Sequence, residues 1–394
     1  MDKDGFMRLL DQIEAYRPRL RESQQIYAAL LDGRTPPRVG IHPNSKEFPW
    51  IPRELGLTIT VKQMLNDPHL MLEVKLRGLL WRLQNIPGED VGIAGGYGWG
   101  VNANFGAPWP ALFTELWWPE DDYPQLQKPA LASAAEVDRL EIPDPARVEL
   151  VGRMVHFAQY FKEIVGDRLP VGAGGFNATP FTNASTIMPM GQLLMDLRDC
   201  PEHVHRLLQL MVDTYIAVAA YIRRQLNLSM PESIGCPDDA CGNIAPQDYE
   251  TFAVPYILQC ARRGSTSGQV IRIHLCGRSQ HLWPSMARLL RPRVMEISPF
   301  GDLMEARRVF GPDTILVGNM DPRIVREGSK EQIREATLAC LRQGMTTPGR
   351  YYFMAGTAGW DMPIRWHSNS ETLGTPLENI NYVNSLVLEH GRYA

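Results

Sequence analysis

The chain has 394 residues, of which 44% are hydrophobic and 21% are charged. This composition is close to the globular average, so we expect one large buried core and exclude a mostly disordered chain. The 40 lysines and arginines against 44 aspartates and glutamates give a net charge of −4, scattered along the chain. A nucleic-acid-binding protein needs a basic face to neutralise phosphates, and the sequence has none.

The six cysteines are too few for a disulfide scaffold in a chain of this length. The N-terminus has no basic segment followed by an apolar one, so we expect no export signal. No apolar run approaches the roughly 18 residues that a membrane-spanning helix needs. We therefore expect a cytoplasmic protein whose cysteines act as thiols, metal ligands or nucleophiles.

Eight short apolar runs, each ended by glycine, proline, asparagine or aspartate, are predicted strands. In chain order they are 38–41, 91–94, 169–173, 233–236, 270–275, 294–297, 314–317 and 351–354. Longer segments with helical spacing follow them, for example 201–226 with its recurring Val204, Leu207 and Met211. Eight strand–helix repeats predict an α/β fold of the closed (β/α)8 TIM-barrel type, whereas five or six would predict an open sheet.

The first part of the chain is less regular than the second. Residues 1–36 carry apolar residues at helical spacing and are predicted to form an N-terminal helical extension that caps the barrel. Residues 37–394 are predicted to form the barrel, with long loops after the first two strands. Two separate domains are the alternative to this single-domain organisation.

The most informative pair follows the fifth predicted strand. In a TIM barrel the reacting groups lie at the C-terminal ends of the strands. Residues two apart on a strand face the same side, so His274 and Cys276 should present an imidazole and a thiolate together. Both are good ligands for Zn²⁺. The alternative is a packed histidine beside a buried thiol.

The end of the preceding strand carries Asp238, Asp239 and Cys241. Neighbouring strands lie about 4.8 Å apart, so these side chains and the His274–Cys276 pair could share one metal ion. We expect Asp239 and Cys241 as candidate metal ligands, and Asp238 and Asp239 as candidate general acids or bases. A solvated turn or a helix cap is the alternative for the two acids.

Aromatic residues and another strand end supply candidate substrate contacts. Tyr97 and Trp99 begin an insertion, 97–118, with seven aromatic residues. Some of these rings should line a lid or pocket, and others should anchor the loop itself. Phe176 and Asn177 follow the third predicted strand. The glycines near Tyr97 do not form a dinucleotide-binding fingerprint, because no helix with a suitably placed acid follows them.

The sequence resembles the uroporphyrinogen decarboxylase superfamily, and within it the corrinoid-dependent methyltransferase branch. The likeness rests on ordered blocks between residues 170 and 391. They are Leu194-Met195-Asp196-Leu197, Pro201-Glu202-His203-Val204, Asp238-Asp239, Ile244-Ala245-Pro246, Pro255-Tyr256, His274-Leu275-Cys276-Gly277, Gly318-Asn319-Met320-Asp321-Pro322 and Thr375-Pro376-Leu377-Glu378-Asn379. The resemblance implies a (β/α)8 barrel and the transfer of a methyl group to a corrinoid carried by a partner protein.

Two departures from the family pattern refine this expectation. The arginine motif and the late histidine of porphyrinogen decarboxylases are missing, which counts against that activity. The zinc methyltransferases of the branch carry a third cysteine after the last strand, where this chain has Thr357. The third metal ligand must then come from elsewhere, with Asp239, Cys241 or His367 as candidates. His367 lies in an insertion with Trp360 and Arg365, where it could also contact substrate.

We therefore expect a cytoplasmic methyltransferase of the O-demethylase type. It would move a methyl group from a small, aromatic methyl ether to a corrinoid protein, with zinc as the candidate metal. One alternative is a metal-independent decarboxylase or other lyase of the same superfamily. Another is a non-catalytic binding barrel. A homodimer is the default oligomeric state.

Overall fold

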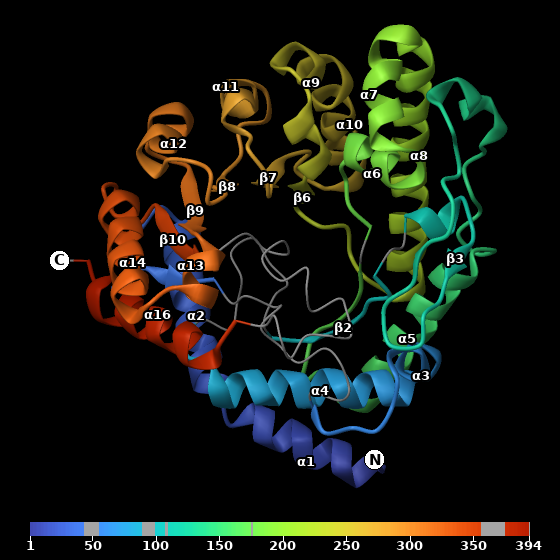
Figure 1. The fold of residues 1–394 in the computed structure, drawn as a ribbon. Coiled ribbons are helices and arrows are strands. Elements are labelled where there is room, and N and C mark those ends of the chain that lie inside the picture. The colour runs from blue at the N-terminus through green and yellow to red at the C-terminus, as the bar shows by residue number, and fades with distance from the viewer. Residues whose placement is uncertain (43–54, 89–98, 107–108, 175, 356–374, 394) are drawn as a thin grey trace.

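The computed structural model describes residues 1–42, 55–88, 99–106, 109–174, 176–355 and 375–393. Its strands and helices form a TIM barrel, in which a ring of parallel strands is surrounded by helices (Figure 1). Among the described helices, none is both long and apolar enough to cross a membrane.

The described barrel strands fall into two parallel sheets. The larger has six strands in the order β1-β10-β9-β8-β7-β6, and the smaller pairs β2 with β5. Their bounds are β1 Gly40–Ile41, β2 Val101–Ala103, β5 Val171–Ala173, β6 Ile234–Pro237, β7 Val270–His274, β8 Val294–Glu296, β9 Ile315–Met320 and β10 Tyr351–Ala355. A short antiparallel pair, β3 (Leu116–Trp117) and β4 (Gln125–Leu126), lies outside this ring.

Seven of the eight predicted strands overlap a described barrel strand. The remaining predicted strand, 91–94, lies outside the described residues. The next described strand after β1 is β2, Val101–Ala103, inside the segment 97–118 that was predicted to be an aromatic loop. That prediction was wrong at this point, because the flanking aromatic residues and glycines obscure a short strand whose Val101 and Ala103 are buried around an exposed Asn102.

Helices surround the strands, and several of them begin at residues that favour a helix N-terminus. Their bounds are α1 Lys3–Glu14, α2 Arg17–Leu31, α3 Val61–Asn66, α4 Pro68–Asn85, α5 Glu149–Val165, α6 Pro180–Ile187, α7 Met190–Asp199, α8 Pro201–Gln225, α9 Pro246–Phe252, α10 Val254–Gly264, α11 Trp283–Ser285, α12 Leu303–Phe310, α13 Pro322–Glu327, α14 Lys330–Gly344 and α16 Leu377–His390. Pro201 and Pro246 open their helices because the first turn needs no backbone N–H. The Ser329 side chain caps α14 by accepting a hydrogen bond from the Gln332 N–H. The Gln332 side chain in turn accepts one from the Ser329 N–H.

The N-terminal helices cover two parts of the barrel. Phe6, Leu10 and Ile13 of α1 are buried in one hydrophobic cluster with residues of α4 and α5. Ile26 and Leu30 of α2 pack in another cluster against the first residues of β8 and β9, Val294 and Ile315. Helix α2 therefore lies over the N-terminal ends of these strands, while their C-terminal ends face the other way. The division at residue 36 stays a prediction.

Candidate functional site

Three donor side chains meet where β6 and β7 end. Pro237, the last residue of β6, pairs with His274, the last residue of β7, so the residues that follow them are neighbours. One ligand atom each of Asp239, His274 and Cys276 lies within 4.8 Å of the others. The His274 Nε2 is 2.9 Å from the Cys276 Sγ and 3.5 Å from the Asp239 Oδ1. The structure thus brings together three of the predicted metal ligands.

Backbone contacts fix the position of this group. The Cys276 N–H donates a hydrogen bond to the Asp239 Oδ1 at 2.7 Å, and the Asp238 N–H donates to the His274 carbonyl oxygen at 2.8 Å. His274 and Cys276 are buried, whereas 42% of the Asp239 side chain is exposed. Asp239 is therefore the member of the group that a molecule from solution can reach.

The other nitrogen of His274 contacts a residue that the sequence did not single out. The His274 Nδ1 bonds to Glu296 on β8, a fully buried carboxylate that also forms an ion pair with Arg272 on β7. A carboxylate accepts the proton of Nδ1, which leaves the lone pair of Nε2 facing Cys276 and Asp239. Glu296 and Arg272 therefore orient the imidazole toward the donor group.

Two sequence features could have revealed these residues. Arg272 lies two positions before His274, so both side chains share one face of β7. Glu296 is a lone acid in an otherwise apolar predicted strand, where a buried charge requires a partner. Their pairing joins different strands, however, and it is not encoded in any local spacing.

Asp238 is buried beside the donor group. The Thr182 hydroxyl on α6 donates to its Oδ1 at 3.0 Å and accepts the Ala240 N–H at 3.2 Å. Burial raises the pKa of Asp238 to about 6, although hydrogen bonds from Cys241 and Thr182 oppose the rise. The carboxyl thus ties the turn after β6 to α6.

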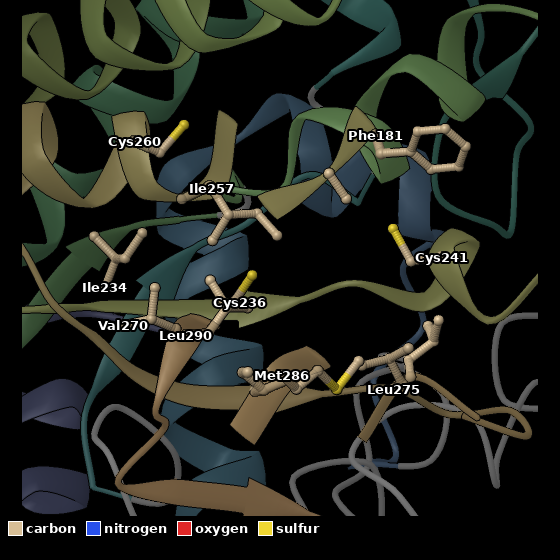
Figure 2. Close-up of a cluster of buried hydrophobic side chains, with 14 of the residues drawn as sticks. Phe181, Ile234, Cys236, Cys241, Ile257, Cys260, Val270, Leu275, Met286 and Leu290 are labelled. Carbon is tan, nitrogen blue, oxygen red and sulfur yellow. The ribbon is translucent and has the colours of Figure 1, made fainter. Parts of the chain in front are cut away.

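Cys241, which was also predicted as a ligand, lies outside the donor group. The 3₁₀ turn Asp239–Asn243 carries its side chain into the hydrophobic cluster that also contains Cys236 and Phe181 (Figure 2). Burial, and then the neighbouring Asp238 carboxylate, raises the pKa of the Cys241 thiol well above its ordinary value. A thiol that resists ionisation in apolar surroundings is a poor metal ligand.

The predicted substrate contacts have different positions. Phe176 and Asn177 follow β5, at the same end of the barrel as Asp239. The Phe176 ring meets the buried Trp109 ring edge-on at 5.8 Å, and Asn177 is exposed. Trp99 instead precedes β2 and lies under the Arg17 guanidinium at 5.9 Å. Because it precedes its strand, Trp99 lies at the opposite end of the barrel from Asp239. This position does not support the prediction that Trp99 contacts substrate.

Several other predicted residues belong to segments that the structure does not describe. Tyr97 and His367 lie outside the described residues, as do Thr357, Trp360 and Arg365. For the aromatic insertion, Phe105 and Trp109 are buried, which agrees with the alternative that part of the insertion anchors itself by packing.

Comparison with known proteins gives the family. The family model described as uroporphyrinogen decarboxylase (URO-D) matches residues 107–369, well over half of the chain. The chain belongs to this family. A uroporphyrinogen decarboxylase of Myxococcus xanthus is 30% identical over 208 residues, which cover 51% of this chain and 57% of that relative. One of Nostoc punctiforme is 28% identical over 247 residues, which cover 60% of this chain and 66% of the relative.

The chain thus matches less than two thirds of the length of these relatives. A solved structure, a methyltransferase from Methanosarcina mazei, covers 92% of this chain with a TM-score of 0.63 and 16% sequence identity. The match extends over 96% of that structure. At this identity the likeness establishes the shared barrel fold and nothing about substrate.

Proposed function

We propose that this family member is a methyltransferase that moves a methyl group from a small aromatic methyl ether to the cobalt of a separate corrinoid protein. The observation that carries the proposal is the group formed by Asp239, His274 and Cys276 at the C-terminal ends of β6 and β7. Active sites of TIM barrels lie at this end. The fold shared with a methyltransferase supports the reaction class.

The donor set suits a zinc ion. Imidazole nitrogen, thiolate sulfur and carboxylate oxygen are the three ligand types that zinc accepts in proteins, and three protein ligands leave one position open, as in catalytic sites. His274 would bind through Nε2, because Nδ1 is engaged by Glu296. A zinc ion held here would act as a Lewis acid on the ether oxygen. It would stabilise the negative charge that develops on that oxygen as the aryloxide leaves.

The residues around the donor group have separate roles in this proposal. Glu296 and Arg272 hold the His274 imidazole in one tautomer and orientation. Asp238 holds the turn that presents Asp239, since its carboxyl is buried and tied to Thr182. Asp239, whose side chain is 42% exposed, would be the ligand nearest to an incoming substrate. The general acid–base role of Asp238 and Asp239 stays a prediction.

Phe176 and Asn177 supply the substrate side of the site. The Phe176 ring offers an apolar surface, braced by Trp109, that suits an aryl group. The exposed Asn177 side chain offers an amide to a polar substituent of that ring. Tyr97 and His367 remain predicted contacts.

A decarboxylase or other lyase is the second candidate, because the curated relatives are uroporphyrinogen decarboxylases. It predicts activity without metal and an unchanged rate after His274→Ala. A non-catalytic binding barrel predicts neither metal nor turnover. The donor group favours the methyltransferase over both, since neither alternative requires an imidazole, a thiol and a carboxylate together.

The test mixes the purified chain with methoxylated phenols and a reduced corrinoid protein, and follows methylcobalt absorbance. We expect methyl transfer with the wild type, and a fall of about a hundredfold or more in Cys276→Ser, because a hydroxyl is a much poorer ligand than a thiolate. Cys200→Ser, at the junction of α7 and α8, is the matched control and should retain full activity. Absence of methyl transfer across the whole panel contradicts the proposal.

A further inference from the structure

A polar cavity lies at the opposite end of the barrel from the donor group. It has a volume of about 520 Å³ and lies between the end of α2 and the segments that lead into β8, β9 and β10. Its lining includes three arginines, namely Arg291, Arg293 and Arg350. Its apolar lining includes the partly exposed Leu31 and Phe310. The donor group at the other end of the barrel has no part in it.

The arginines of this cavity lack carboxylate partners in the described part of the chain. The Arg350 side chain donates to two carbonyl oxygens, those of Gly349 at 2.9 Å and Gly33 at 3.5 Å. Its Nε is buried and has no hydrogen-bond partner among the described residues. The Arg291 side chain donates to the carbonyl oxygen of Arg288, at 3.4 Å. A carbonyl oxygen satisfies a donor without neutralising its charge.

The carboxylates near the cavity do not balance this charge. Asp32 is paired with Arg34 at 2.9 Å, outside the set of lining arginines. Asp313 is the other acid in the lining, and it is exposed. Three arginines against this one carboxylate leave an excess of about two positive charges, which suits a doubly charged anion.

A fourth arginine adds to the positive field behind the lining. Arg307 is held by the carbonyl oxygens of Gly311, Thr314 and Arg350, at 2.7, 2.6 and 2.8 Å. Burial, and then the nearby Arg350, lowers the pKa of Arg307, as expected where guanidinium groups gather. The positive charge is therefore a property of the whole region and extends beyond one exposed side chain.

The conformation of Arg291 also requires explanation. It has a φ of 47° and a ψ of 55°, in the left-handed region. Glycine or asparagine adopts this backbone conformation at a lower conformational energy than arginine does. The backbone therefore gives no reason for an arginine here. An anion that the guanidinium contacts would give one.

We propose that this cavity binds an organic phosphate, a dianion attached to an apolar or aromatic body. The guanidinium groups suit phosphate oxygens, which they can bind through two parallel N–H bonds. The cavity is far larger than a bare phosphate needs and lies within the usual range of small-molecule sites. Leu31 and Phe310, which are both partly exposed, supply the apolar surface for the body of the ligand.

The experiment measures binding of phenyl phosphate and inorganic phosphate to the full chain by calorimetry at low salt. We expect phenyl phosphate to bind about tenfold or more tightly than inorganic phosphate, because its ring is buried. The double variant Arg291→Gln with Arg293→Gln should bind phenyl phosphate at least about tenfold more weakly. Both side chains are exposed, so these changes should leave the fold intact.

Two control variants localise the binding. Arg334→Gln removes an exposed arginine of α14 outside the cavity, and Cys276→Ser alters the donor group at the other end of the barrel. Both should bind phenyl phosphate as the wild type does. No measurable binding, equal binding of the two anions, or an undiminished affinity in the double variant would overturn the proposal.

Discussion

The two ends of the barrel handle charge in different ways. Near the C-terminal ends of the strands, Glu296 of β8 pairs with both Arg272 and His274 of β7. At the N-terminal ends, Arg291 and Arg293 contact no carboxylate among the described residues. The first arrangement neutralises buried charge within the chain and leaves donor atoms in a fixed orientation. The second leaves charge that a molecule from solution can neutralise.

The largest expected effect comes from the charge pairing at the first end. Glu296→Gln removes the carboxylate from the buried ion pair with Arg272 and from the bond with the His274 Nδ1. Breaking a buried ion pair on one side typically costs about 3–5 kcal/mol, because the remaining charge stays out of water. We expect a loss of this size in the free energy of unfolding, measured by urea denaturation.

The matched change at the other end sharpens this comparison. Arg293→Gln removes an exposed charge and should change the free energy of unfolding by less than about 0.5 kcal/mol. If both variants lose the same free energy of unfolding, the two ends of the barrel do not differ in how their charges contribute to stability. A loss below about 1 kcal/mol in Glu296→Gln contradicts the structural role given to that residue.

A buried lysine provides a second contrast with Arg272. Burial lowers the pKa of Lys75 on α4 to about 7, so the folded protein disfavours its charged form. Between about pH 7 and the ordinary lysine value of 10.5, the unfolded chain binds this proton and the folded chain largely does not. Lys75 therefore lowers stability as the pH falls through this window.

Lys75→Met should remove this penalty. We expect the variant to be more stable than the wild type by on the order of 4 kcal/mol at pH 7, and the difference to shrink toward pH 10. Denaturation of both proteins at several pH values measures it. A difference that stays constant with pH, or grows as the pH rises, would show that Lys75 is charged in the folded protein.

Much of the barrel could be predicted from the sequence because its strands are buried. The runs 270–275 and 351–354 closely match β7 and β10, since parallel strands covered by helices read as short apolar segments. The second strand was missed because Val101–Ala103 is very short and is flanked by aromatic residues and glycine. Local composition there reflects the packing of the loop more than the strand.

The site was partly predictable for a geometric reason. His274 and Cys276 lie two apart, and Asp239 follows the neighbouring strand, so barrel topology alone brings them near one another. Cys241 follows the same strand, but the direction of the 3₁₀ turn decides where it points, and the sequence does not encode that direction plainly. Glu296 was missed because its partners come from another strand.

The central claim is that Asp239, His274 and Cys276 hold one metal ion, and elemental analysis of protein purified without chelators tests it most directly. We predict about one zinc per chain in the wild type and in Cys200→Ser, and a small fraction of that in Cys276→Ser. Circular dichroism establishes that each variant is folded. A wild type without zinc, or a folded Cys276→Ser that retains all of it, would contradict the account.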